Sequence, residues 1–128
     1  YAEIKNIVFN VNISAKINTG SMKIYDFCKV LGILLDNALE AASESEKKYA
    51  ELMITEKPDK TGLVIDITNS FAGHVDIEKI YENGFSTKSD HSGFGLWEVK
   101  KILSKHKNCC LKTTVADNIF MQHLEILY

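Results

Sequence analysis

The chain is organised around the nine residues LLDNALEAA, Leu34–Ala42, which lie at the centre of a long amphipathic pattern. From about Tyr25 to Ser43, apolar side chains recur at spacings of three and four residues, which predicts a helix with one buried face. The residues of this apolar stripe are Phe27, Leu31, Leu34, Leu35, Ala38 and Ala42. Such a stripe has to be covered, so the flanking segments are expected to supply a sheet.

Both sides of this helix carry the patterns of strands. Before it, Ile7–Ile17 alternates apolar and polar residues, which is the period of a half-buried strand. After it, Glu51–Glu56 and Leu63–Thr68 read as two strands joined by a turn that contains proline and glycine. The chain closes with Cys109–Val115 and Ile119–Leu127, and the short polar connection between them predicts a hairpin.

Two more helices are predicted between these strand pairs. Asp76 can cap a short helix that runs to about Glu82, and an amphipathic helix follows from about Leu96 to Lys105. This order of elements indicates an α+β fold, an α/β sandwich with a mixed, mostly antiparallel sheet of about five strands and about three helices on one face. Residues 1–128 are expected to form a single domain with one core.

Composition and charge narrow the classes of function. Fifteen basic and seventeen acidic residues give a net charge of −2, whereas a nucleic-acid-binding domain usually has a basic surplus. No apolar run approaches the roughly 20 residues of a membrane-spanning helix, so we expect no membrane contact by the domain itself. Cys28, Cys109 and Cys110 lack the spacing of a zinc site or a disulfide framework, which favours reduced thiols. Redox sensing by the adjacent pair is the alternative.

A glycine-rich segment, Gly84–Leu96, leads directly into the last predicted helix. Gly93 and Gly95 allow backbone N–H groups to face an anion at the positive end of that helix. Further donors for a phosphate come from Ser86, Thr87 and Lys88. The spacing matches neither a P-loop nor a dinucleotide fingerprint, and an ordinary surface loop is the alternative interpretation.

Two asparagines add candidate ligand contacts. Asn37 lies about 120° from the centre of the apolar stripe, on a second flank that we expect to be partly buried. The other residues of this flank are Ile33, Glu40, Ala41 and Glu44. An amide oxygen in this position suits Mg²⁺, which prefers oxygen ligands and phosphate partners. Asn69 stands at the end of a predicted strand, where its side chain could hydrogen-bond the edge of an adenine. Taken singly, each asparagine could equally be a boundary or turn residue.

Three segments of the chain, taken in sequence order, resemble the motifs of the ATPase and kinase family shared by gyrase, the heat-shock chaperone, histidine kinases and MutL. Leu34–Ala42 is similar to the family's N box, with Asn37 in the place of the magnesium-binding asparagine. Ile65–Gly73 is similar to the G1 box, and Gly84–Leu96 is similar to the G2 region. The likeness covers nearly the whole chain and implies a Bergerat-type ATP-binding fold.

The resemblance also implies a site for ATP and Mg²⁺. Asn37 would hold the metal, Asn69 would contact adenine, and Lys88 with the backbone of residues 93–96 would hold the phosphates. The implied nucleotide contacts are Asn37, Glu40, Ala41, Asn69, Gly73, Ser86, Thr87, Lys88, Gly93, Phe94, Gly95 and Leu96.

Three departures from the family pattern narrow the resemblance. Asn69 replaces the usual aspartate, and Phe71 replaces the first G1 glycine. This pattern of replacements is similar to that of the receptor kinases of peptide quorum sensing. The amide oxygen of asparagine can accept a hydrogen bond from adenine but carries no charge, so we expect weaker nucleotide binding. Ile33 occupies the position of the glutamate base of the hydrolysing members, and an apolar side chain is no base. The chain is therefore expected to be a kinase with no catalytic general base of its own.

The implied function is that of the catalytic domain of a sensor histidine kinase, a protein histidine kinase in two-component signalling. The γ-phosphoryl group would pass to a histidine on a separate dimerisation domain of the same receptor, with a response regulator downstream. The chain begins at Tyr1 without Met, which suggests a fragment of a longer protein. The resemblance implies a cytoplasmic domain of a membrane-anchored receptor. Two alternatives remain open: an anti-sigma-type serine kinase of the same fold, and a pseudo-kinase scaffold that binds no nucleotide.

The four histidines lie outside the acceptor helix that the resemblance places before this domain. They are His74, His91, His106 and His123. We interpret His106 and His123 as solvated or packing residues, and His91 as a residue within reach of the expected phosphates.

Overall fold

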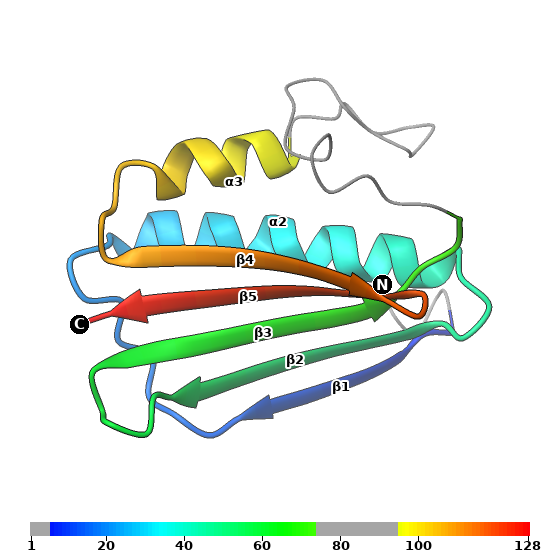
Figure 1. Ribbon diagram of the computed structural model, residues 1–128, viewed down its shortest axis with the longest axis horizontal. Coiled ribbons are helices and arrows are strands. Elements are labelled where there is room, and N and C mark those ends of the chain that lie inside the picture. The colour runs from blue at the N-terminus through cyan, green and yellow to red at the C-terminus, as the bar shows by residue number, and fades with distance from the viewer. Residues whose placement is uncertain (1–5, 74–94) are drawn as a thin grey trace.

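The computed structural model describes residues 6–73 and 95–128, which form one sheet with two helices on one of its faces (Figure 1). The elements are β1 Val8–Ile13, α2 Ile24–Ser43, β2 Tyr49–Glu56, β3 Gly62–Ser70, α3 Gly95–Leu103, β4 Cys109–Ala116 and β5 Ile119–Leu127. The five-stranded sheet has the order β1-β2-β3-β5-β4, with β1 parallel to β2 and the other pairs antiparallel. The predicted fold class is confirmed. The short helix predicted at Asp76–Glu82 lies outside the described residues.

Helix α2 forms where the apolar pattern predicted it and covers the middle of the sheet. Its buried residues are Phe27, Val30, Leu34, Ala38 and Ala42. They belong to a core whose inward strand residues are Leu52, Ile54, Leu63, Ile65, Ile67, Leu124 and Ile126. Leu31 and Leu35 of the predicted stripe are only half-buried, because the contact is centred nearer to the fully buried Val30. In the described part of the chain, neither helix is long and apolar enough to cross a membrane.

Strand β1 is shorter than predicted, since it ends at Ile13 rather than Ile17. Only the first alternating apolar side chains are covered: Ile7 is buried and Phe9 is half-buried. Val11 and Ile13 are 53% and 54% exposed. The reason is the position of β1 at the edge of the sheet. Helix α2 packs on β2 and β3, and the far end of β1 lies beyond its cover.

The two predicted connections between antiparallel strands are both confirmed. Asp117 and Asn118 have φ values of 51° and 62°, which is the left-handed backbone of a two-residue type I′ hairpin turn. The turn between β2 and β3 is closed by the N–H of Lys57, which donates to the carbonyl of Gly62 at 2.8 Å. These turns fix the register that brings the end of β3 beside the starts of β2 and β5.

Gly62 begins β3 at a point where β5 passes very close. A Cβ atom at this position would lie 2.6 Å from the backbone oxygen of Ile126. Gly62→Ala is therefore expected to lower the free energy of unfolding by about 1–3 kcal/mol, because backbone has to shift. The matched control is Gly32→Ala in α2, where nothing lies within 4 Å of the new Cβ. That change should raise the free energy of unfolding by about 0.5–1 kcal/mol. Urea unfolding measures both, and a loss in both variants would contradict the account.

Candidate functional site

The inner face of the sheet, which carries the core, becomes polar toward the end of β3. In its middle, Ile65 pairs with Ile54 and Leu124, and all three are buried. Asn69 has the same strand alternation as Ile65, so its side chain also faces the helices. It pairs with Ala50 and Phe120 and is 2% exposed. The predicted adenine residue therefore lies on the side of the sheet that the helices cover.

Helix α2 supplies the predicted metal ligand and two of its neighbours. Asn37, Glu40 and Ala41 are half-buried, whereas Asp36 beside them is exposed. The second flank is therefore partly buried as predicted, except at Glu44, which is exposed because it lies just beyond the end of α2. The roles of these residues stay predictions. Ile33 lies on the same flank and packs against the core. The hydrolase position of this helix is thus filled by an apolar packing residue.

Helix α3 begins at Gly95, the last glycine of the predicted phosphate segment, followed by Leu96. Figure 1 shows the start of α3 at the same end of the molecule as the end of α2 and the end of β3. The two helices pack on each other, and Lys29 Nζ lies 2.6 Å from Glu98 Oε1. Both ions are well exposed, so this pair contributes little to the stability of the fold. The N–H groups at the start of α3 thus lie at the end of the sandwich where Asn69 stands.

Among the remaining predicted nucleotide contacts, only Gly73 lies within the described residues. Gly73 is exposed and has a φ of 83°, a left-handed backbone that glycine adopts without steric cost. Phe71 is buried, and its N–H donates to the carbonyl of Asn118 at 3.1 Å, so this departure from the G1 pattern anchors the segment after β3. The predicted contacts that lie outside the described residues are Ser86, Thr87, Lys88, Gly93 and Phe94.

Two polar pairs were not predicted from the sequence: one is buried near this end of the sheet, and the other is partly buried midway along β4 and β5. The hydroxyl oxygens of Ser45 and Ser70 lie 2.7 Å apart. Thr113 donates its hydroxyl to Gln122 Oε1 at 2.6 Å, directly across β4 and β5. Gln122 had a signal, because a polar residue interrupts the inward positions of a strand that are otherwise apolar. The serines had none, since nothing in the local pattern sets them apart.

The donor atoms present suit a magnesium ion that arrives with a nucleotide. In the described residues, no group of three or more His, Cys, Asp and Glu side chains is arranged to hold a metal. A magnesium ion characteristically keeps several waters and takes one or two protein ligands besides substrate phosphates. The amide oxygen of Asn37 is a hard donor of the kind required, so the residues fit such an ion.

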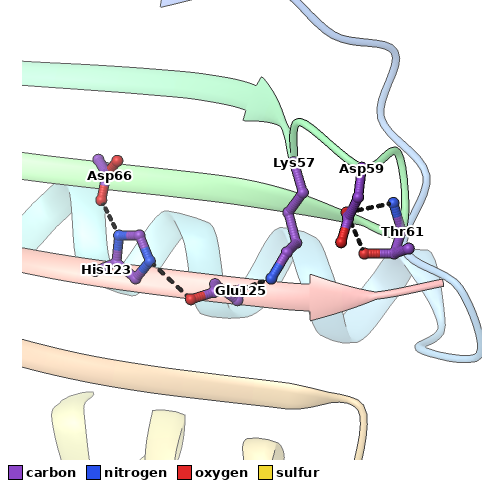
Figure 2. Close-up of polar contacts among 6 residues, drawn as sticks. All are labelled: Lys57, Asp59, Thr61, Asp66, His123 and Glu125. Atoms are coloured by element: carbon purple, nitrogen blue, oxygen red, sulfur yellow. Dashed lines mark hydrogen bonds and ion pairs between the residues drawn. The ribbon is translucent and has the colours of Figure 1, made fainter.

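A second polar cluster lies on the opposite face of the sheet and is shown in Figure 2. His123 Nδ1 contacts Asp66 Oδ1 at 2.5 Å, and His123 Nε2 contacts Glu125 Oε2 at 3.1 Å. Lys57 Nζ lies 2.7 Å from Glu125 Oε1. Burial lowers the pKa of His123, but its hydrogen bonds to Asp66 and Glu125 outweigh burial, and the pKa is raised. His123 is thus an ion-paired residue that links β3 and β5.

This cluster predicts a dependence of stability on pH. Because the folded-state pKa of His123 lies above the unfolded value of about 6.5, its stabilising contribution is complete below that pH and is lost as the pH rises through the folded pKa. Lys112 pairs with His123 in register across β4 and β5. As the pH rises from about 6 to about 8, a range that includes the ordinary histidine pKa, we expect the midpoint temperature of unfolding to fall. The fall should be steeper for the parent chain than for His123→Gln. Circular dichroism measures both profiles, and parallel profiles would show that His123 makes no such contribution.

His106 is also paired with a carboxylate rather than placed at the nucleotide end. Its Nε2 lies 3.3 Å from Asp26 Oδ2, which joins the segment after α3 to the first turn of α2. This agrees with its interpretation as a packing residue. His74 and His91 lie outside the described residues.

The three cysteines are free thiols in this structure. Burial raises the pKa of Cys109, which makes its thiol less reactive. Cys109 and Cys110 are consecutive residues of β4, so their side chains point to opposite faces of the sheet. This arrangement gives no support to redox sensing by the pair.

Comparison with known proteins places this geometry in a family. The family model of the GHKL domain matches residues 22–127. The sensor histidine kinase DpiB of Escherichia coli (strain K12) is 31% identical over 100 residues, which are 73% of this chain and 17% of DpiB. The sensor protein CitS of Bacillus subtilis (strain 168) is 32% identical over 71 residues, which are 56% of this chain and 13% of CitS. The chain therefore spans less than a fifth of the length of these relatives.

Solved structures of histidine kinases have the same fold. The nucleotide-free catalytic domain of histidine kinase ThkA has a TM-score of 0.74 at 24% identity, covering 98% of this chain and 82% of that one. The mycobacterial sensor histidine kinase MprB has a TM-score of 0.78 at 19% identity, with 98% and 85% covered. ThkA in complex with the response regulator TrrA has a TM-score of 0.75 at 21% identity, with 98% and 35% covered. At these identities the likeness establishes the fold.

Proposed function

The chain belongs to the GHKL domain family and has the fold of histidine kinase catalytic domains, and on this premise we propose that it binds ATP with Mg²⁺ and donates the γ-phosphoryl group to a histidine. The acceptor would lie on a separate dimerisation domain, and a response regulator would receive the group next. The structure of ThkA with TrrA supports this choice of downstream partner. By analogy with the named sensor kinases, we further propose that the domain works in the cytoplasm as part of a longer receptor.

The observation that carries this proposal is the placement of the two asparagines. Asn37 lies on the half-buried flank of α2, and Asn69 lies on the inner face of β3 at the end where α3 starts. The Nδ2 of Asn69 donates to the carbonyl of Ser70 at 2.9 Å, which leaves the side-chain oxygen as the acceptor for the amine of adenine. This placement supports Asn69 as the proposed contact for the base and Asn37 as the proposed ligand of the metal.

The burial of Asn69 has a consequence for affinity. A side chain that is 2% exposed has to be uncovered before a base can contact it. The free energy of that rearrangement is subtracted from the binding free energy, so the apparent affinity falls. This adds to the weaker contact expected from an amide in place of a carboxylate. We therefore propose a nucleotide site of modest affinity.

The phosphates would be held at the start of α3. The N–H groups near Gly95 and Leu96 lie at the positive end of that helix, and Ser86, Thr87 and Lys88 are proposed to add donors. When bound, Mg²⁺ would neutralise charge that develops on the transferred phosphoryl group. Since Ile33 offers no base, the residues of this chain position the nucleotide and leave activation of the acceptor to the partner domain.

A labelling experiment tests this reaction. The chain is incubated with Mg²⁺, ATP labelled on the γ-phosphate and a dimerisation domain, in wild-type form and with its acceptor histidine changed to alanine. Label that appears on the wild-type domain alone, and that acid removes while base does not, would support transfer to histidine. Acid-stable label on a serine would favour the anti-sigma-type kinase, and no label with either domain would favour the pseudo-kinase scaffold. The likeness to quorum-sensing kinases stays a prediction, since the relatives above are named only as sensor proteins.

A further inference from the structure

A buried hydrogen-bond network joins the segment after α2 to the start of β2 and the end of β3. Its two side chains, Ser45 and Ser70, are 5% and 2% exposed. Ser45 lies just beyond α2, whereas Ser70 is the last residue of β3 and directly follows Asn69. Their oxygens, 2.7 Å apart, bridge segments that are 25 residues apart in the sequence. The network therefore lies beside the proposed nucleotide site but outside the residues assigned to it.

The two hydroxyl protons of this network have three acceptor contacts to serve. Ser45 Oγ lies 2.8 Å from the carbonyl of Ala42 and accepts from the N–H of Lys48 at 3.1 Å. Ser70 Oγ accepts from the N–H of Tyr49 at 2.9 Å and lies closer to Ser45 Oγ than to the Tyr49 carbonyl at 3.2 Å. Each hydroxyl has one proton and two lone pairs. The two shortest contacts are used when Ser45 donates to Ala42 and Ser70 donates to Ser45, while the Tyr49 carbonyl is the longer, alternative acceptor for Ser70.

This chain of bonds connects the two asparagines of the site. Ser45 binds the last turn of the helix that carries Asn37, and Ser70 receives the side-chain amide of Asn69 on its carbonyl at 2.9 Å. The other contacts between α2 and β3 are mainly apolar. Apolar packing is non-directional and permits small sliding motions, whereas a hydrogen bond holds a narrow range of distance and angle. The serine pair is thus a directional link between the end of the helix and the end of the strand.

We propose that Ser45 and Ser70 are positioning residues for the nucleotide. Their hydrogen bond holds the helix of Asn37 and the strand of Asn69 at the separation that one ATP molecule with its Mg²⁺ spans. This inference rests on the proposed function. Neither serine contacts the nucleotide. When the bond is lost, both asparagines remain, but their spacing varies, and a ligand that has to reach both binds less well.

The test measures binding of non-hydrolysable ATP and GTP analogues, with Mg²⁺, to Ser45→Ala, Ser70→Ala and the double variant of this chain. Each single change is expected to weaken ATP-analogue binding about fivefold to tenfold, as the loss of one buried hydrogen bond implies. The preference for adenine over guanine should narrow as well. The double variant should bind about as well as the weaker single variant, because both changes remove the same bond.

Gly62→Ala is the control for lost stability, because it perturbs β3 at its opposite end. It should bind the ATP analogue as the parent does. If the serine variants lose only thermal stability and keep the affinity and base preference of the parent, the network is structural and the inference is wrong. Should Ser70→Ala not fold, Ser45→Ala decides the question, because it removes the other end of the bond. Failure of the parent itself to bind would overturn the proposed function and the inference with it.

Discussion

Asn37→Ala is expected to weaken binding of an ATP analogue in the presence of Mg²⁺ by about 10- to 100-fold, the range typical for disturbed metal sites. The side chain is half-buried on α2, and no cluster of metal-binding side chains is present among the described residues to replace it. Without Mg²⁺ the change should have little effect, because the amide is proposed to act on the metal rather than on the base. Isothermal titration with and without Mg²⁺ measures the difference.

Asp36→Ala is the matched control for this change. Asp36 adjoins Asn37 on the same helix but is exposed, so its loss alters the local charge without touching the flank that faces the site. Its affinity for the analogue should stay near that of the parent in both conditions. If Asn37→Ala retained full Mg²⁺-dependent binding, or if Asp36→Ala lost as much, the proposed metal position would be wrong.

Asn69→Ala is expected to lower the affinity for ATP by about 10- to 100-fold, because a buried hydrogen-bond acceptor is lost from the base site. The preference for adenine over guanine should disappear with it. Stability should fall too, since the carbonyl of Ser70 loses its partner in a buried place. Competition between adenine and guanine nucleotides, measured at a temperature at which the variant is folded, reports the base preference directly.

The control for this variant is Thr68→Ala on the same strand. Thr68 adjoins Asn69, but strand alternation directs it to the opposite face of the sheet, where it is half-buried. Its base preference should equal that of the parent. An Asn69→Ala chain that still prefers adenine would show that another residue reads the base.

The fold was predictable to the extent that its signals are local. Periodicity placed α2 and the four antiparallel strands because each has one covered face, and covered faces leave a pattern in the sequence. The same reasoning overextended β1, since the pattern records which residues are apolar and not whether a helix covers them. Val11 and Ile13 continue the alternation at an edge that α2 does not cover.

The candidate site was predictable only in part. The burial of Asn37 followed from its angle on the helix, and the position of Asn69 followed from the end of its strand. The Ser45–Ser70 hydrogen bond could not be predicted from the sequence, because it depends on how α2 and β3 pack in three dimensions. The same holds for His123 and Asp66, which are 57 residues apart and adjacent only because β3 pairs with β5. Contacts of this kind are set by strand register, which single residues do not reveal.

Calorimetric titration of the parent chain with a non-hydrolysable ATP analogue shows whether this end of the sandwich is an ATP·Mg²⁺ site. We expect saturable binding of one analogue per chain, strengthened by Mg²⁺ and weaker for the guanine analogue. No saturable binding at millimolar analogue, with or without Mg²⁺, would contradict this expectation and would favour a scaffold that keeps the GHKL fold without a nucleotide.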